Sequence, residues 1–286
     1  MNEIWTLVCG AWGDALASYG NICKVLDEKG LQKANVVYYG LDKEVSKFLK
    51  HQKRIDKVMR LDISEPLVYF KYAGLAAGDF NSWMKITGLN EQIPDLIPTH
   101  INRYYNIENP TDCNRDFEVQ IPDADPELNL KQYEPYILFQ PYSCHSCTFD
   151  KHWPHWMEAL NWVLENVDGK VVLVGNLTSD FDQTFKFPWI EHPRLVNLVE
   201  STTSMVDVFH LMNNANGVVT TSNALSIWSI LTKKPALVVC NQIIKERSKY
   251  YYNWIHHEPN KVLEPTSTLL EFEKEFRDWF PAISKV

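Results

Sequence analysis

The feature that most constrains this chain is an alternation of short apolar runs with segments of helical periodicity, and it occurs in two separate stretches. In the first stretch, strands are expected at 4–8, 34–39 and 57–61, and helices at 15–26 and 43–52. Strands that alternate with helices form a parallel sheet covered on both faces, because each crossover helix packs against the sheet. This stretch therefore predicts an α/β domain.

A proline-rich and acidic segment, residues 121–126, follows and is interpreted as the start of an interdomain linker. The alternation then restarts, with strands expected at 136–140, 170–175, 195–198, 217–221 and 236–240, and helices at 153–166, 205–214, 224–232 and 269–280. The predicted fold class is α/β, with two Rossmann-like doubly wound domains that face a central cleft. Ligands of such domains bind outside the carboxyl ends of the strands.

We place the domain boundary at 130/131, which gives an N-terminal domain of residues 1–130 and a C-terminal domain of residues 131–286. The last helix carries apolar and aromatic side chains on one side, so packing back onto the N-terminal domain is an option for it. Residues 62–115 are less regular, with one strand candidate at 67–70.

Composition limits the partners and the compartment. The 286 residues include 28 Lys and Arg against 36 Asp and Glu, a formal charge of −8, which disfavours nucleic acid as a bulk partner. No signal peptide and no apolar run of about 20 residues is evident, so we expect a cytoplasmic protein without a transmembrane segment. Peripheral membrane contact stays open. Cys9, Cys23 and Cys240 lie in apolar or helical runs, which suits a reducing compartment.

The loop Gly10–Asp14 joins the first strand to the first helix. Glycine permits the tight turn, and Asp14 stands at the helix start, where a carboxylate caps backbone N–H groups. The glycine spacing does not match G-x-G-x-x-G, so hydride transfer with a nicotinamide cofactor loses its main support. Capping alone and a chemical role both explain Asp14.

Two later segments also join a strand to a helix. Lys151 stands just before a helix, where its charge and the N–H groups of the helix start can hold an anion. The segment 217–226 passes from a strand through a hydroxyl-rich turn into a helix, an arrangement that can bind a diphosphate. The structural alternatives are a solvated surface lysine and a simple N-cap at Ser222 or Asn223.

Three stretches resemble glycosyltransferase family 9, the heptosyltransferase family with the two-domain GT-B fold: GDALASYGNICKVL, DKHWPHWMEAL and STTSMVDVFHLMNNANGVVTTSNALSIWSILTKKPALVV. The resemblance implies an enzyme that transfers a hexosyl, pentosyl or heptosyl group from a nucleotide-diphosphate sugar to an acceptor hydroxyl. It implies an inverting, metal-independent reaction that needs no cofactor. It also assigns the acceptor to the N-terminal domain and the nucleotide sugar to the C-terminal domain.

The resemblance also assigns roles to residues. Asp14 matches the aspartate that is the proposed general base of the family, and Lys151 matches the lysine that contacts the donor phosphate. Both are therefore catalytic candidates. Further donor-binding candidates, besides Lys151, are Gly13, Thr221, Ser222, Asn223, Ala224 and Asp180.

One departure from the family pattern concerns the sugar. The family commonly has Asn-Asp-Ser/Thr-Gly in the last loop and a histidine three residues after its glycine, whereas this chain has residues 221–224 as Thr-Ser-Asn-Ala and then Ile227. The missing carboxylate and imidazole contact the sugar in the family. Nucleotide-diphosphate binding is therefore expected to be kept, but the sugar need not be heptose.

The acceptor is expected to be a saccharide, such as a lipopolysaccharide-type glycan. Segment 245–252 interleaves cations and aromatic rings, a pattern that can also stack bases, so a hydroxymethylated base in DNA is an alternative acceptor. The charged outer face of a helix is the structural alternative there, and a solvated helix end explains the basic cluster at 51–57. Candidate acceptor-binding residues are Trp12, Lys245, Arg247 and Tyr250.

Two other readings stay open. Two acid pairs, Asp123/Asp125 and Asp180/Asp182, would suit a metal-dependent transferase, which is the first alternative. Cys144 and Cys147 lack the second ligand pair of a structural zinc site, so the favoured interpretation includes no metal. Alternatively, the chain is a non-catalytic nucleotide-sugar-binding protein, because the last loop lacks the family's carboxylate and histidine.

Overall fold

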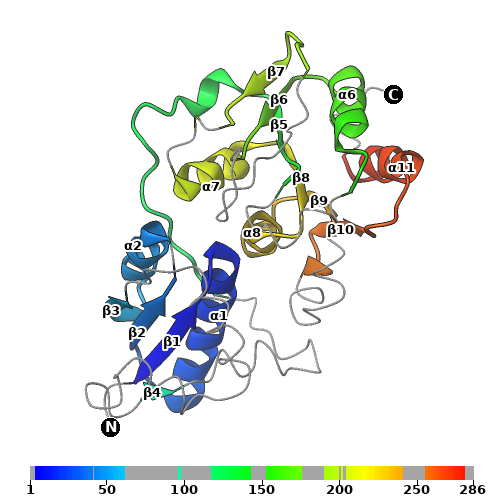
Figure 1. Cartoon of the computed structure of the whole chain (residues 1–286). Coiled ribbons are helices and arrows are strands. Elements are labelled where there is room, and N and C mark those ends of the chain that lie inside the picture. The colour runs from blue at the N-terminus through cyan, green and yellow to red at the C-terminus, as the bar shows by residue number, and fades with distance from the viewer. Residues whose placement is uncertain are drawn as a thin grey trace. The chain divides into compact units, whose positions relative to one another are not determined.

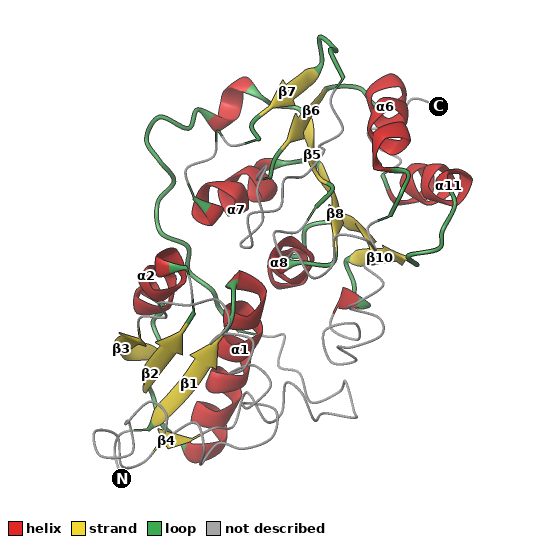
Figure 2. Ribbon diagram, in the orientation of Figure 1, coloured by secondary structure: helices red, strands yellow, loops and turns green. Residues whose placement is uncertain are grey.

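The computed structural model of the chain describes residues 4–40, 42–61, 96–97, 117–142, 153–175, 190–199, 201, 204–240 and 255–280. The chain divides into two compact units, residues 1–122 (unit 1) and 123–286 (unit 2). Each unit contains a β-sheet and helices that alternate with its strands (Figures 1 and 2). All strand pairs in the described residues are parallel.

Unit 1 contains a four-stranded sheet with the order β3-β2-β1-β4. Its strands are β1 (Trp5–Cys9), β2 (Ala34–Tyr39), β3 (Ile55–Leu61) and β4 (Leu96–Ile97). Helix α1 (Trp12–Lys29) connects β1 to β2, and α2 (Lys43–His51) connects β2 to β3. The order of elements is the one that the alternating pattern predicts.

Local sequence explains where these two helices begin and end. Helix α1 ends at Gly30, which adopts the left-handed conformation (φ 64°) that glycine tolerates best. Helix α2 begins after Asp42, whose Oδ1 accepts a hydrogen bond of 2.8 Å from the backbone N–H of Glu44. The two helices contact each other, with the rings of Trp12 and Phe48 centred 5.3 Å apart.

Unit 2 contains a six-stranded sheet with the order β10-β9-β8-β5-β6-β7. Its strands are β5 (Tyr136–Gln140), β6 (Lys170–Leu173), β7 (Leu195–Asn197), β8 (Gly217–Thr221), β9 (Ala236–Val239) and β10 (Asn260–Leu263). Every residue of β8 and β9 is buried, as expected for central strands covered on both faces. The helices among the described residues of this unit are α6 (Trp156–Asn166), α7 (Met205–Asn214), α8 (Ala224–Thr232) and α11 (Leu269–Trp279), with a 3₁₀ turn η3 at Leu130–Gln132.

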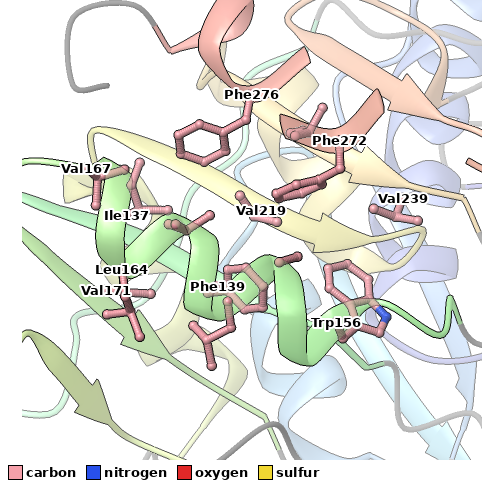
Figure 3. Close-up of a cluster of buried hydrophobic side chains, with 14 of the residues drawn as sticks. Ile137, Phe139, Trp156, Leu164, Val167, Val171, Val219, Val239, Phe272 and Phe276 are labelled. Atoms are coloured by element: carbon pink, nitrogen blue, oxygen red, sulfur yellow. The ribbon is translucent and has the colours of Figure 1, made fainter. Parts of the chain in front are cut away.

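One hydrophobic core cluster of unit 2 lies between the sheet and the helix pair α6 and α11, while α7 and α8 lie on the other side of the sheet (Figure 1). Phe272 and Phe276 of α11 are fully buried and point toward Val219 of the sheet (Figure 3). The apolar face of α11 is thus used within unit 2, and packing of the last helix against the N-terminal domain stays a prediction.

The boundary between the units falls at 122/123, before the expected 130/131. Residues after Pro122 bond to unit 2: the backbone N–H of Asp125 donates to Asp207 Oδ1 (2.9 Å), and Lys170 Nζ donates to the carbonyl of Gln132 (2.6 Å). The segment that follows the prolines is therefore anchored to α7 and β6, and the chain changes unit earlier than the strand pattern alone indicates.

Most strands and helices lie within two or three residues of their expected positions. Strand β3 begins two residues early, at Ile55, and β10 was not expected. The strand candidate at 67–70 lies outside the described residues. Among the helices that the structure describes, none combines the length and the apolar character needed to cross a lipid bilayer.

Candidate functional site

In both sheets the winding direction changes beside the first strand of the unit. Strand β1 lies between β2 and β4, and β5 lies between β6 and β8. Loops leave the carboxyl ends of the strands in opposite directions at such a point, and ligands of doubly wound folds bind there. The turn after β1 in unit 1 and the turn after β8 in unit 2 are therefore the described candidates, each considered within its own unit.

In unit 1, the turn after β1 positions Asp14. Asp14 Oδ2 accepts a hydrogen bond of 3.0 Å from the backbone N–H of Ala11, which precedes the first residue of α1. Gly10 has φ 104°, and a Cβ atom at this position would lie 2.0 Å from the same Asp14 oxygen. Glycine is thus needed both for the backbone conformation and for space. The predicted capping role of Asp14 is confirmed, and its chemical role stays a prediction.

A buried tyrosine holds the same turn from the neighbouring strand. The Tyr38 hydroxyl donates to the carbonyl of Gly10 (2.9 Å), and Tyr38 is fully buried. A Cβ atom on Gly40 would lie 2.1 Å from that hydroxyl oxygen. The carboxyl ends of β1 and β2 are therefore fixed to each other, which gives Asp14 a rigid support.

Trp12 was expected to contact the acceptor, a role that stays a prediction, and the structure shows which contacts hold it. Its side chain is 6% exposed, its ring packs against Phe48, and its Nε1 donates to Asp42 Oδ2 at 2.6 Å. These contacts make Trp12 a packing residue between α1 and α2. Gly13, the second residue of α1, is partly exposed.

In unit 2, the turn between β8 and α8 contains the predicted donor-binding residues Thr221 to Ala224. Thr221 is buried, and its hydroxyl donates to the carbonyl of Val239 (3.1 Å). Asn223 is the N-cap of α8, because its Oδ1 accepts from the backbone N–H of Leu225 (2.8 Å). The Thr221 hydroxyl is thus used in the fold, and the donor-binding role of Thr221 stays a prediction.

Backbone groups and the helix dipole remain at this turn. Ser222 and Ala224 are both nearly buried, at 5% and 9% exposure. In the described part of the chain, the backbone N–H of Ala224, the first residue of α8, has no acceptor. The start of α8 therefore presents an N–H group and the positive end of a helix dipole, which together favour an anion.

Gln140, at the carboxyl end of β5, is a residue of this region that the sequence analysis missed. Its Oε1 accepts hydrogen bonds from Asn223 Nδ2 (2.6 Å) and from the Thr220 hydroxyl (3.1 Å). The available signal was a polar residue at the end of the apolar strand YILFQ. Only the sheet order, which places β5 beside β8, reveals its connection to Asn223.

Several predicted site residues lie outside the described residues: Lys151, Asp180, Asp182, Lys245, Arg247 and Tyr250. The structure does describe Trp153, two residues after Lys151. Its Nε1 donates to the carbonyl of Ser267 (2.6 Å), and its ring packs against Trp156 and Phe272. That anchor fixes the end of the β5–α6 loop. The central cleft expected between the two domains stays a prediction.

The ionisable clusters of the described residues have structural partners. In the basic segment 51–57, Lys53 pairs with Glu118 (2.7 Å) and Arg54 pairs with Asp27 (2.6 Å), in agreement with a solvated helix end. Asp125 Oδ1 accepts from the backbone N–H of Glu127 (2.9 Å) and stabilises a turn. Within the described ranges, no group of three or more His, Cys, Asp or Glu residues is arranged to hold a metal ion.

No protein-family model matches this chain, and neither does any curated protein sequence. Solved structures do share its fold. Escherichia coli heptosyltransferase WaaC with ADP has a TM-score of 0.56 at 12% identity, over 98% of this chain and 100% of that one. A glycosyltransferase family 9 structure from Veillonella parvula has a TM-score of 0.55 at 12% identity, over 97% and 91% of the two chains.

A third solved structure comes from a different kind of protein. It is assigned as a UDP-N-acetylglucosamine 2-epimerase of Listeria monocytogenes, with a TM-score of 0.51 at 12% identity over 99% of this chain and 91% of that one. The predicted fold, α/β with two Rossmann-like units of the GT-B type, is confirmed by these likenesses. Because a transferase and an epimerase share it, the reaction has to be argued from the site.

Proposed function

We propose that this chain is a glycosyltransferase that moves a sugar from a nucleoside-diphosphate sugar to an acceptor hydroxyl, with inversion and without a metal ion. The observation that carries the proposal is the start of α8 at the winding reversal of unit 2, where an N–H group and a helix dipole favour an anion. The solved WaaC structure, which has the same fold, contains ADP. A nucleoside diphosphate is therefore the ligand class we assign to unit 2.

The leaving group determines what unit 2 has to supply. When the bond between the sugar and the diphosphate breaks, the bonding electrons go to the diphosphate oxygen. Fixed donors that face this oxygen lower the barrier, because they require no rearrangement as the charge develops. In the proposal the Ala224 N–H is such a donor, the dipole of α8 contributes a fixed partial positive charge, and Lys151 adds a full positive charge.

The acceptor hydroxyl needs a proton acceptor, and the proposal assigns this role to Asp14. The hydrogen bond from the Ala11 N–H holds Asp14 in the turn after β1, and a positioned carboxylate can act as a general base. The acceptor oxygen attacks the anomeric carbon on the face opposite the diphosphate, so the configuration inverts. The hydroxyl proton passes to Asp14.

A second candidate function is nucleotide-sugar binding without transfer. It is favoured by the turn before α8, where Thr221 and Asn223 are both engaged in structural hydrogen bonds. The turn also lacks the carboxylate and the histidine that contact the sugar in family 9. Among acceptors, we propose a saccharide, such as a lipopolysaccharide-type glycan. A hydroxymethylated DNA base is the alternative.

Thermal-shift measurements with ADP-, UDP-, GDP- and CDP-sugars test the proposal first. A ligand at 100 times its dissociation constant stabilises the folded protein by about 2.7 kcal/mol, so the correct nucleotide is readily detected. Release of the nucleoside diphosphate is then measured with and without saccharide acceptors. Transfer predicts release that depends on the acceptor, whereas a binding protein shows a thermal shift without product. No shift with any nucleotide sugar would refute both functions.

The metal-independent form of the reaction has its own test. We expect turnover to be unchanged by EDTA, because the proposed charge stabilisation comes from Lys151 and the start of α8. Loss of turnover with EDTA, restored by Mn²⁺ or Mg²⁺, would instead indicate a metal-dependent transferase, for which the sequence favours the acid pair Asp180 and Asp182.

A further inference from the structure

The hydrogen bonds around Asn223 fix the orientation of its own side-chain amide and then that of Gln140. The backbone N–H of Leu225 is only a donor, so the atom of Asn223 that faces it must be the oxygen Oδ1 (2.8 Å). Asn223 therefore directs its Nδ2 toward Gln140, at 2.6 Å. The atom of Gln140 at that contact must in turn be the oxygen Oε1, and the amide orientations follow from the network.

This orientation leaves the nitrogen of Gln140 pointing away from the network. Its Oε1 already accepts from Asn223 and from the Thr220 hydroxyl, and Thr220 is fully buried. Gln140 is partly exposed, and in the described part of the chain its Nε2 donates to no acceptor. Two N–H bonds of a fixed amide are thus available at the carboxyl end of β5.

We propose that Gln140 is a donor-binding residue whose Nε2 donates to an oxygen of the diphosphate, with Asn223 as the residue that positions it. The inference rests on the function proposed above. The available groups at this end of the sheet, Gln140 Nε2 and the N–H of Ala224, are both donors. They fit a group that only accepts, and phosphate oxygens satisfy this requirement better than sugar hydroxyls.

The network also explains how an uncharged turn can bind an anion. Gln140 comes from β5 and Asn223 from the start of α8, so one hydrogen bond joins the two elements that flank the winding reversal. Because both ends of the Asn223 amide are engaged, the Gln140 donors are already oriented before a ligand arrives. Such preorganised donors lose little conformational entropy on binding.

Isothermal titration of the full chain with inorganic pyrophosphate, ADP and UDP tests this assignment. Gln140→Met keeps the length of the side chain but removes both the donor and the acceptor. We expect pyrophosphate and the preferred nucleotide to bind about 10- to 100-fold more weakly, the loss typical of one hydrogen bond to a charged group. Gln132→Met, at an exposed position of η3 in the same unit, is the matched control and should bind like the unmodified chain.

A second variant keeps the test decisive if Gln140→Met does not fold. Gln140→Glu still accepts from Asn223 and Thr220, so its melting temperature should stay close to that of the unmodified chain. It lacks the N–H donors, and it also adds a negative charge. Repulsion is screened in high salt, so a weakening that persists at about 0.5 M salt reports the missing donor.

A comparison of single and double variants at Gln140 and Asn223 tests whether Asn223 positions Gln140 for binding or only supports the fold. Asn223→Ser keeps an N-cap but loses the bond to Gln140. We expect a smaller loss of affinity than with Gln140→Met, and the double variant should lose less than the product of the two single losses, because both act through one amide. Pyrophosphate binding that is equal in Gln140→Met and the unmodified chain would overturn the inference. If the unmodified chain binds no nucleoside diphosphate, the proposed function itself fails.

Discussion

Asp14 has a structural contact and a proposed chemical role, and one substitution separates them. Asp14→Asn keeps an oxygen that can accept from the Ala11 N–H, so the cap of α1 is retained. It removes the carboxylate that would accept the acceptor proton. We expect turnover to fall about a hundredfold or more, the size typical of a general base, with little change in melting temperature.

Asp42 provides the control for this experiment. It is also an aspartate at a helix start in unit 1, where it caps α2 through the N–H of Glu44. Asp42→Ala removes this cap and the acceptor of Trp12 Nε1, so it should lower stability by about 2 kcal/mol, yet leave turnover within a few-fold of the unmodified chain. Near-normal turnover in Asp14→Asn would mean that Asp14 is only a cap.

Cys23 yields a prediction that depends on pH. It is 3% exposed in α1, and burial raises the pKa of its thiol from the usual 9.0 to about 11. Since the thiolate is the reactive form, we expect iodoacetamide at about pH 8 to leave Cys23 unmodified in the folded chain and to label it in urea. Mass spectrometry of the Cys23 peptide measures this. Full labelling of the folded chain would contradict the burial.

The same pKa has a consequence for stability. The folded state holds the Cys23 proton more tightly than the unfolded chain, so this contribution is complete below pH 9.0 and is lost as the pH rises toward about 11. Alkaline conditions therefore weaken unit 1 through this residue.

At the residue scale, the sequence predicts which residues cap helices better than it predicts the hydrogen-bond partners of hydroxyl and amide side chains. Asp14 and Asn223 are both caps, as their positions before or within the first helical turn indicate. The Thr221 hydroxyl, however, bonds to Val239 on the next strand, and Gln140 bonds to Asn223 across the sheet. Both partners depend on strand order, which a local pattern does not contain.

At the element scale, two glycines with positive φ provide a matched pair. A Cβ atom at Gly10 (φ 104°) would collide with the Asp14 carboxylate, whereas at Gly30 (φ 64°) it would meet nothing within 4 Å. Gly30→Ala should therefore cost about 1 kcal/mol, the penalty of the left-handed conformation alone. Gly10→Ala should cost more and should also displace Asp14.

Chemical denaturation and turnover measurements check this pair together. We expect Gly30→Ala to retain turnover and Gly10→Ala to lose most of it. Equal stability losses in the two variants would show that the turn after β1 can relax around a methyl group. Equal turnover would show that the position of the Asp14 carboxylate does not matter for the reaction.

Elements with strong patterns were predictable, and elements that depend on neighbours were not. Strands β8 and β9 are continuous apolar runs because both faces are covered, so they are visible in the sequence. Strand β10, NKVL, has only two apolar residues and lies at the sheet edge, so its pairing with β9 is set by the sheet. The bonds of Asp125 and Lys170, which move the unit boundary to 122/123, are likewise tertiary.

At the scale of the whole molecule, net charge bears on the choice of acceptor. The chain carries a formal charge of −8, and in the described part of the basic segment 51–57 Lys53 and Arg54 are paired with carboxylates. A protein that binds DNA through phosphates exchanges those contacts for counterions, so its affinity falls steeply with salt. A neutral saccharide acceptor has no such dependence.

We therefore expect the KM for the acceptor to change only a few-fold between about 50 and about 200 mM salt. A DNA acceptor held by six or more phosphate contacts would lose about a thousandfold in affinity over the same range. The KM for the nucleotide-sugar donor, measured in the same series, is the control. The donor diphosphate also responds to salt, but the donor is the same whether the acceptor is a saccharide or DNA. A steep rise in the acceptor KM alone would favour the hydroxymethylated base and would assign the cations of 245–252 to DNA binding.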